Sequence, residues 1–408
     1  MIETDVIITG AGPAGMTTAL KLAGTGIKVA VIEKDTYPRE KICGDALSGK
    51  VMNILRRLPG DAYSEFLSQV EKHPAWGISF IAPDMTRLDV PFHTGSREKN
   101  IAPVYLCKRF YFDKFLYEQC CKYDNINLYE NQEVKKVYMA NGRAFAETGN
   151  ETYNAKMIIG ADGHRSLLRK SLTTGQAGKQ NTCLAVRAYY ENVSGAHLGG
   201  FLELFFLKEL LPGYLWIFPI AGNLFNVGLG MMQSHVIKRK INLSRLLEQI
   251  TATHPQISPR FRDAKLVSKY KAHSLPLGTQ KAIRSGERFL LLGDAASLVD
   301  PFSGEGIGNA MASGEVAGEM IRRCFREDRF DADFLTYYDR RIASQILGEF
   351  RYSKTLQVLG RSARIFNFFA KRAARDNELK DLLETILIDD RFRNRLKNPL
   401  FYVKLLFK

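Results

Sequence analysis

A glycine-rich turn near the N-terminus constrains the fold more than any other feature. It reads Gly10-Ala-Gly12-Pro13-Ala14-Gly15 and separates an apolar segment that begins at Asp5 from a segment, 13–22, with apolar residues at helical spacing. A second apolar segment follows and ends at Glu33. Strand, glycine turn, helix and strand in this order predict a βαβ unit, whose backbone amides receive a pyrophosphate at the positive end of the helix.

Glu33 indicates which nucleotide fits this turn. A carboxylate at the end of the second strand can accept hydrogen bonds from a ribose hydroxyl, and it would repel a 2′-phosphate. The turn therefore favours the adenosine half of FAD or NAD over that of NADP. A glycine turn by itself can be an ordinary tight turn, so the prediction depends on the whole order of elements.

A second glycine-rich block, 292–311, follows another apolar segment, 288–294. Asp294 ends that segment, where its carboxylate can bind a polyol hydroxyl. The turn from Pro301 to Gly308 holds three glycines, which let a helix N-terminus lie close to a flat ring and stabilise negative charge at its carbonyl edge. The alternative is a glycine loop that only caps a helix.

The pattern predicts an α/β fold with a discontinuous, three-layer Rossmann-type domain over 1–75, 105–180 and 280–345. At 408 residues and 45% hydrophobic, the chain is long enough for two cores. Alternating, aromatic-rich segments in 76–104 and 181–279 predict an antiparallel substrate-binding sheet domain. A helical region, rich in Arg, Lys, Phe and Leu, is expected over 346–408.

Composition narrows the choice of partners. The net charge of +15 favours an anionic partner such as a dinucleotide, a phospholipid surface or a pyrophosphate-bearing substrate. No zinc-finger spacing and no dense run of Lys and Arg occurs, so nucleic acid is not expected. The six cysteines form no CxxC pair, so no metal site is expected. We expect a reduced, cytoplasmic setting.

One uncharged stretch, 213–232, is long enough to span a bilayer, but glycines, Pro219 and two asparagines interrupt it. We interpret it as two paired strands. The segment from Asp5 is interpreted as a strand and not as a cleavable leader.

Three motifs in order resemble the FAD-dependent oxidoreductases of the para-hydroxybenzoate hydroxylase fold over about residues 1–345. They are the N-terminal turn, the segment Gly160-Ala-Asp162-Gly163-His-Arg165-Ser166, and the block that contains Gly293-Asp294. Two further segments are similar to those of the geranylgeranyl reductase family: Lys41-Ile-Cys43-Gly44-Asp45 and Gly213-Tyr214-Leu-Trp216-Ile-Phe218-Pro219.

The resemblance implies FAD as the cofactor and a role for each matching position. Ala14 and Glu33 would contact adenosine, Val134 the adenine, and Arg109 the phosphates or ribityl chain. The residues that the resemblance places around FAD are Gly10, Gly12, Pro13, Ala14, Gly15, Glu33, Lys34, Cys43, Gly44, Asp45, Arg109, Val134, Asp162, Gly163, Asp294, Pro301, Gly304, Gly306 and Ile307.

Cys43, Tyr214 and Trp216 are the candidate catalytic residues. Tyr214, Trp216 and Phe218 alternate and face one side of a strand. They form either a core stripe or an apolar wall over the flavin that would suit an isoprenoid. Cys43 is either a small buried hydrophobe or a proton relay.

The resemblance favours reduction of carbon–carbon double bonds in a prenyl lipid by hydride transfer. The alternatives are an aromatic or polyketide hydroxylase of the same fold, or a flavin-binding protein without turnover. A halogenase is less favoured, because its WxWxIP segment is only partly matched. The electron donor stays open among NADPH, ferredoxin and a quinol. The C-terminal helices either pack on the protein or contact the inner face of a membrane.

Overall fold

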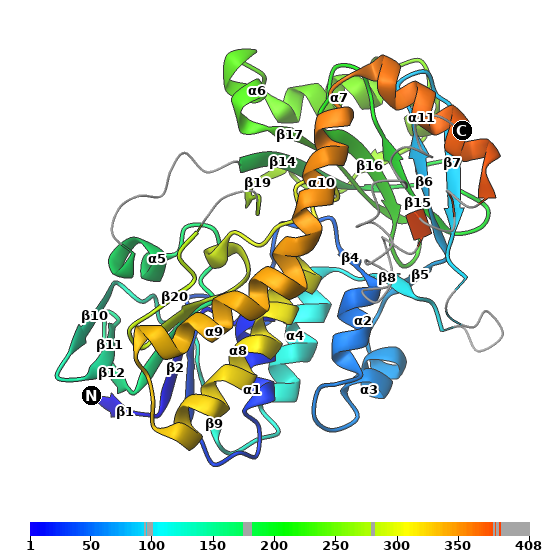
Figure 1. Cartoon of the computed structure of the whole chain (residues 1–408). Helices are drawn as coiled ribbons and strands as arrows, with labels where there is room; N and C mark the ends of the chain where they lie inside the picture. Colours follow the sequence, from blue (N-terminus) through cyan, green and yellow to red (C-terminus); the bar gives the residue numbers. More distant parts are fainter. Residues whose placement is uncertain are drawn as a thin grey trace.

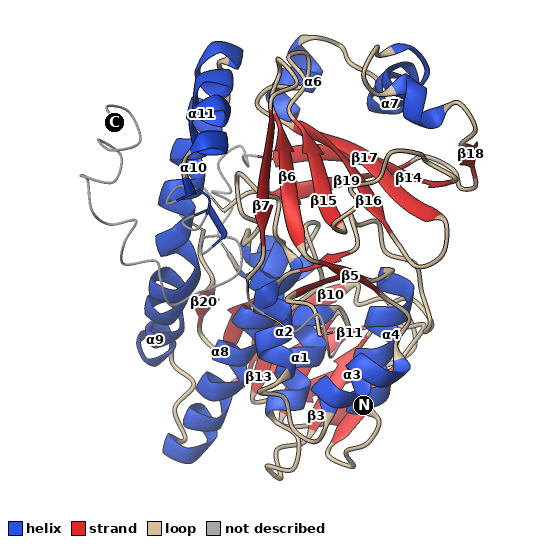
Figure 2. Ribbon diagram, turned by 90° about the vertical axis from the view of Figure 1, so that its right-hand side faces the viewer, coloured by secondary structure: helices blue, strands red, loops and turns tan. Residues whose placement is uncertain are grey.

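The computed structural model of the chain describes residues 1–93, 95, 101–173, 182–278, 282–377, 380 and 383–384 (Figure 1). Two sheets stand one above the other in Figure 2, with the cofactor motifs on the lower one. The lower, six-stranded sheet has the strand order β20-β21-β13-β2-β3-β9. Its strands are β20 (Ser285–Gly286), β21 (Phe289–Leu291), β13 (Met157–Gly160), β2 (Val6–Thr9), β3 (Val29–Ile32) and β9 (Ile126–Tyr129).

The central strands of this sheet are parallel and buried along their whole length. Continuous apolar segments produce such strands because both faces are covered. Helices α1 (Pro13–Lys21), α4 (Arg109–Cys120) and α8 (Ile307–Glu327) pack together on one face. The third layer is a sheet of order β1-β12-β11-β10, made of β1 (Ile2–Glu3), β12 (Thr152–Ala155), β11 (Arg143–Glu147) and β10 (Lys136–Ala140).

The upper sheet has eight strands in the order β18-β14-β17-β16-β15-β6-β7, with β19 also paired to β14. The uncharged stretch 213–232 forms the antiparallel strands β16 and β17, as predicted. The bounds are β6 (Gly77–Ile81), β7 (Arg87–Pro91), β14 (Thr182–Glu191), β15 (Phe201–Phe205), β16 (Tyr214–Pro219), β17 (Leu224–Met232), β18 (Lys265–Leu266) and β19 (Lys271–Pro276).

The expectation of a purely antiparallel sheet is wrong at one point, because β15 pairs with β6 in parallel. The β6–β7 hairpin and the strands from β14 onward come from separate parts of the chain. No tight turn joins β6 to β15, so turn geometry does not set their relative direction.

The last helices run along both halves of the molecule (Figure 1). Helix α9 (Ala332–Ile342) continues through a π-helical segment (Ala343–Leu347) into α10 (Gly348–Leu359), and α11 (Ala363–Arg375) follows and packs on β7. The predicted C-terminal helices are thus present. Of the region 346–408, residues 378–379, 381–382 and 385–408 lie outside the described residues; they include Leu382 and Leu387, two of the leucines expected in these helices.

The remaining elements complete the two halves. A small sheet of order β4-β8-β5 lies between them. In the described ranges, no helix combines the length and the apolar character needed to cross a bilayer. The bounds are β4 (Ala46–Leu47), β5 (His73–Ala75), β8 (Val104–Leu106), α2 (Gly49–Leu55), α3 (Ala62–Gln69), α5 (Leu167–Leu172), α6 (Gln233–Lys238), α7 (Leu243–Thr253) and the short 3-10 turns Ser258–Phe261 and Gly293–Ala296.

Candidate active site

A cavity of about 1070 Å³ lies between the carboxyl ends of the lower strands and one face of the upper sheet. Its lining includes most of the residues predicted to surround FAD, together with Cys43, Tyr214 and Trp216. One end is built from backbone and polar groups, and the other end is apolar. Open α/β sheets bind ligands at this place, outside the carboxyl ends of the strands.

The N-terminal glycine turn forms one wall of the polar end. Gly10 has φ +93°, and a Cβ atom there would lie 2.4 Å from the carbonyl oxygen of Ala161. Gly12 caps α1 and has open space at its Cβ position. Gly15 does not line the cavity. A Cβ atom at Gly15 would lie 2.1 Å from the carbonyl oxygen of Gly10, so this position has no room for a side chain. Gly10 and Gly15 therefore shape the turn, and Gly12 leaves space beside the helix end.

Glu33 lies next to this turn and lines the cavity. Its Oε2 accepts a hydrogen bond of 2.9 Å from the amide of Ala11, and Oε1 accepts one of 3.2 Å from the amide of Asp35. The carboxylate is therefore held at the end of β3 by backbone donors. Lys34 and Val134 line the same end.

Asp162 and Gly163 close the polar end from β13. The Oδ2 atom of Asp162 accepts a 2.7 Å hydrogen bond from the amide of Leu167, at the start of α5. Its Oδ1 atom is buried and has no hydrogen-bond partner in the described part of the chain. A buried oxygen without a donor is costly unless a ligand or water satisfies it. Together with the helix end at Gly12, it suits a dinucleotide.

Arg109 lines the cavity, but its guanidinium is already paired. Its Nε and Nη2 atoms donate to the carboxylate of Asp113 at 2.5 and 2.6 Å, and Arg39 donates to the same carboxylate at 3.1 Å. Asp113 is one turn further along α4, a spacing at which side chains meet. Sequence reasoning identified Arg109 without this carboxylate, which holds the guanidinium in place at the cavity wall.

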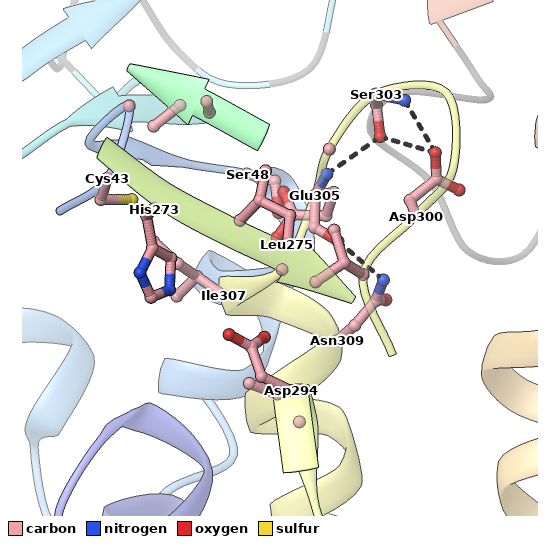
Figure 3. A pocket seen from close by; sticks show the side chains of 18 of the residues that line it. Cys43, Ser48, His273, Leu275, Asp294, Asp300, Ser303, Glu305, Ile307 and Asn309 are labelled. Atoms are coloured by element: carbon pink, nitrogen blue, oxygen red, sulfur yellow. Dashed lines mark hydrogen bonds between the residues drawn. The ribbon is translucent and has the colours of Figure 1, made fainter. Parts of the chain in front are cut away.

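The second glycine block also lines the cavity (Figure 3). Asp294 points into the space, and burial raises the pKa of its carboxyl group while the Lys41 charge opposes the rise. Gly304, Gly306 and Ile307 also line the cavity. Pro301 does not; it lines a neighbouring space of about 60 Å³, and its carbonyl accepts a 2.7 Å hydrogen bond from Gln357 of α10.

Asp300 holds the loop that carries these glycines, and sequence reasoning missed it. Its Oδ1 accepts hydrogen bonds from the amides of Phe302 and Ser303 at 2.9 and 2.8 Å. Figure 3 shows the bond from Ser303. Its Oδ2 accepts a 2.5 Å bond from Ser353 of α10. An Asp followed by Pro and Ser is a turn signal that could have indicated the loop contacts. The bond to Ser353, 53 residues away, has no local signal.

The Cys43–Asp45 turn is tied to the aromatic strand by a buried network. Asp45 does not line the cavity; its Oδ2 accepts from Tyr189 Oη at 2.7 Å and from Asn226 Nδ2 at 2.8 Å. Asn226 also donates to the carbonyl of Cys43 and accepts the indole N–H of Trp216, both at 2.8 Å. Asn226 and Tyr189 were not predicted. An Asn at an inward position of an apolar strand is the one signal that could have identified the network.

The candidate catalytic residues meet where the two ends of the cavity join. Cys43, Gly44, Tyr214 and Trp216 all line this junction. Tyr214 Oη donates a 2.5 Å hydrogen bond to the carbonyl of Ser303. Burial raises the pKa of the Cys43 thiol, against the Arg109 charge, and also raises the pKa of Tyr214. Both groups therefore keep their protons at neutral pH.

The other end of the cavity is apolar and is closed by α11. Its lining from the upper sheet is aliphatic and aromatic, and α11 contributes Phe366, Phe369, Ala370 and Ala373. The sheet residues are Ile78, Phe80, Leu88, Phe92, Ala185, Leu202, Leu204, Phe206, Phe218 and Leu275. Such a surface offers no polar partner, so it suits a hydrocarbon chain.

Known proteins resemble the chain in sequence and in fold. Digeranylgeranylglycerophospholipid reductase 2 of Methanococcoides burtonii is 29% identical over 355 residues, 82% of this chain and 79% of that protein. Menaquinone reductase of Mycolicibacterium smegmatis is 28% identical over 330 residues, 78% and 76% of the two chains. A geranylgeranyl bacteriochlorophyll reductase-like structure from Thermoplasma acidophilum has a TM-score of 0.80 at 20% identity, covering 97% and 99%.

The family match covers just over half of the chain. Residues 3–214 match the FAD binding domain family, and this range includes the first two FAD motifs, the Cys43–Asp45 turn and Arg109. The predicted cofactor, FAD, and the predicted oxidoreductase class are both confirmed. The chain therefore belongs to the FAD binding domain family and is an FAD-dependent oxidoreductase.

Proposed function

We propose that this enzyme reduces carbon–carbon double bonds of a prenyl lipid. One observation carries the proposal: a single cavity joins the polar end, which suits FAD, to an apolar end that suits a hydrocarbon chain. The names of the relatives support the choice, because one acts on a digeranylgeranyl lipid and another on menaquinone. An apolar substrate gains about 0.8 kcal/mol for each methylene buried.

In this proposal, the polar end binds FAD with the residues predicted from the sequence. The amides beside Gly12 meet the diphosphate, Glu33 the ribose, and Asp294 the ribityl chain. FAD, once reduced, supplies the hydride, and the protein orients the two reactants and excludes water. Gly304, Gly306 and Ile307 are proposed to lie against the ring, on a loop that Asp300 holds in place.

Cys43 and Tyr214 are the proposed proton donors. Hydride addition to a double bond requires a proton at the neighbouring carbon, and both side chains carry a proton and line the cavity where the lipid would meet FAD. Trp216 is proposed as a fixed wall, because its indole N–H is bonded to Asn226 and the ring cannot turn without breaking that bond.

We also propose the domain roles predicted from the sequence. Residues 1–75, 105–180 and 280–345 would bind FAD, and 76–104 and 181–279 would bind the lipid under α11. The outer face of α10 and α11 would contact an anionic membrane surface. That face exposes Val358, Ile365 and Phe368 beside the cations Arg361, Arg364 and Arg375, a combination typical of interfacial helices.

A single-turnover experiment tests the proposal. The FAD-loaded enzyme is reduced with dithionite without oxygen, and a digeranylgeranyl glycerophospholipid or menaquinone is added. We expect the flavin absorbance to return and the lipid to gain two hydrogens per bond reduced, as measured by mass spectrometry. Each predicted electron donor, NADPH, ferredoxin or a quinol, is then supplied in place of dithionite.

Other outcomes distinguish the alternatives. Oxygen consumption coupled to hydroxylation of an aromatic or polyketide compound would identify a hydroxylase. Bound FAD that is not reoxidised by either lipid, and is not reduced by any donor, would identify a flavin-binding protein without turnover. Either result would contradict the proposed reductase.

A further inference from the structure

A buried arginine in the cavity has no use in the reaction described above. Arg187, on β14, is 3% exposed and lines the cavity. Its guanidinium lies over the ring of Tyr189, 4.1 Å from the centroid. Nowhere in the described ranges does it form a hydrogen bond or an ion pair, and its Nε is buried without a partner. Burial of a cation without a bonded anion is unfavourable, so an anionic ligand is expected at this position.

The carboxylates near Arg187 are already engaged. Asp45 accepts hydrogen bonds from Tyr189 and Asn226. Glu40 is paired with Lys271 of β19. Neither of them bonds Arg187. The guanidinium therefore keeps donors available on the side that faces the cavity.

Further donors lie beside Arg187. Its register partner on β19 is Lys271, which is paired with Glu40 and does not line the cavity. His273, which does line the cavity, is paired with Ala185, two residues along β14. Diagonal pairs of this kind have side chains within reach of each other. The Nε2 atom of His273 is buried without a partner in the described part of the chain. His273 and Cys43 lie at the same side of the cavity (Figure 3), and Lys41 lines it too.

The register of the upper sheet places a row of paired residues across the sheet, and their side chains change from polar to apolar along the row. Lys271, Arg187, Gly228, Trp216, Leu204, Phe80 and Leu88 are successive partners from β19 to β7. At about 4.8 Å between strands, the row extends roughly 24 Å from Arg187 to Leu88. Arg187 is the cation of this row that lines the cavity, and the row ends with apolar side chains. This is the polarity of a lipid with an anionic head group and a hydrocarbon tail.

We propose that Arg187, with His273 and Lys41, binds the phosphate of the lipid head group. The inference rests on the proposed function for the identity of the lipid. It assigns an orientation: the head group at the β14–β19 edge, and the chain across Trp216 toward β6, β7 and α11. Guanidinium groups bind phosphate oxygens through paired, charge-assisted hydrogen bonds, and Arg187 has the free donors for this.

Calorimetry on the FAD-loaded enzyme tests the assignment with geranylgeranyl diphosphate, geranylgeraniol and inorganic pyrophosphate. We expect the wild type to bind the diphosphate at least about tenfold more tightly than the alcohol. R187Q should abolish most of this preference without lowering the affinity for the alcohol. R187K should retain part of the preference. R165Q, at an exposed arginine that also lines the cavity, is the matched control and should keep the preference.

Three outcomes would overturn the proposal. An unchanged preference in R187Q would place the head group elsewhere. An equal loss of affinity for the diphosphate and for the alcohol in R187Q would indicate a structural role. A lower FAD content in R187Q would indicate that the cation binds the cofactor. This test is independent of the reductase proposal. If the wild type binds pyrophosphate and R187Q does not, the anion site is supported even if no prenyl compound is reduced.

Discussion

The two ends of the cavity are built in different ways. The polar end is made of short segments that each follow a strand, and its functional atoms are backbone amides and carboxylates held by backbone donors, as at Glu33. The apolar end is a composite of six strands and α11, and its side chains have no directional partners. The polar end therefore recognises one fixed group through geometry, and the apolar end accepts a chain through burial alone.

The largest effect is expected from substitutions in the glycine turn of the polar end. G10A should abolish FAD binding and lower stability, because the residue has φ +93° and its Cβ would lie 2.4 Å from a carbonyl oxygen. G12A, whose Cβ has open space in the protein itself, should fold normally but bind FAD at least about tenfold more weakly. FAD content and thermal unfolding distinguish the two. Full FAD content in G12A would show that the diphosphate does not lie there.

The next test concerns the support beneath the polar end. D113A removes the carboxylate that pairs Arg109 and Arg39; Arg39 keeps its ion pair with Glu33, but the buried Arg109 loses its carboxylate partner. Breaking a buried pair from one side costs about 3–5 kcal/mol. Urea unfolding measures the loss. The control is K114A, which removes an exposed pair with Glu118 worth at most about 0.5 kcal/mol; a similar loss in both would contradict the assigned role of Asp113.

A matched pair on α11 sharpens the description of the apolar end. Phe369 lines the cavity, whereas its neighbour Phe368 is 51% exposed and does not. F369A should raise KM for a prenyl lipid in detergent by about tenfold through lost burial, with FAD content unchanged. F368A should leave that KM unchanged and weaken binding to anionic vesicles. If the two variants behave alike, α11 does not separate a lipid site from a membrane face.

The smallest effect concerns pH at the junction of the two ends. Burial, followed by the Lys41 charge, lowers the pKa of His273 to about 3 from an ordinary 6.5. As the pH falls, the unfolded chain therefore binds this proton before the folded chain does. The folding free energy that depends on neutral His273 is fully present above pH 6.5 and is lost as the pH falls toward 3. Unfolding free energies should decline more steeply in the wild type than in H273N. Parallel curves would contradict this environment for His273.

Much of the polar end could be predicted because its signals are local. The β2–α1–β3 unit, the two glycine blocks and the Cys43–Asp45 turn each occupy one short segment, where spacing reports backbone geometry directly. The resemblance to known motifs then connected these segments. Pro301, Gly15 and Asp45 were grouped with the lining residues because spacing alone does not distinguish a residue that faces a ligand from one that shapes the turn.

The apolar end and the supporting contacts depend on distant parts of the chain. The Asp45–Asn226–Trp216 network joins three segments, and the Asp300–Ser353 bond joins a loop to α10. The parallel pairing of β6 with β15 and the cover formed by α11 are also long-range. Periodicity identifies such strands and helices, but it does not state which faces meet, and so the row that contains Arg187 required the sheet register.

The central claim is that one cavity holds FAD and a prenyl chain end to end. A crystal structure of the FAD-loaded enzyme with a geranylgeranyl lipid tests it most directly. The account predicts the flavin ring between the Cys43–Gly44 turn and the Gly304–Gly306 loop, and the chain between the upper sheet and α11 with a double bond against the ring. A chain bound outside this cavity, or FAD bound away from the glycine turn, would contradict it.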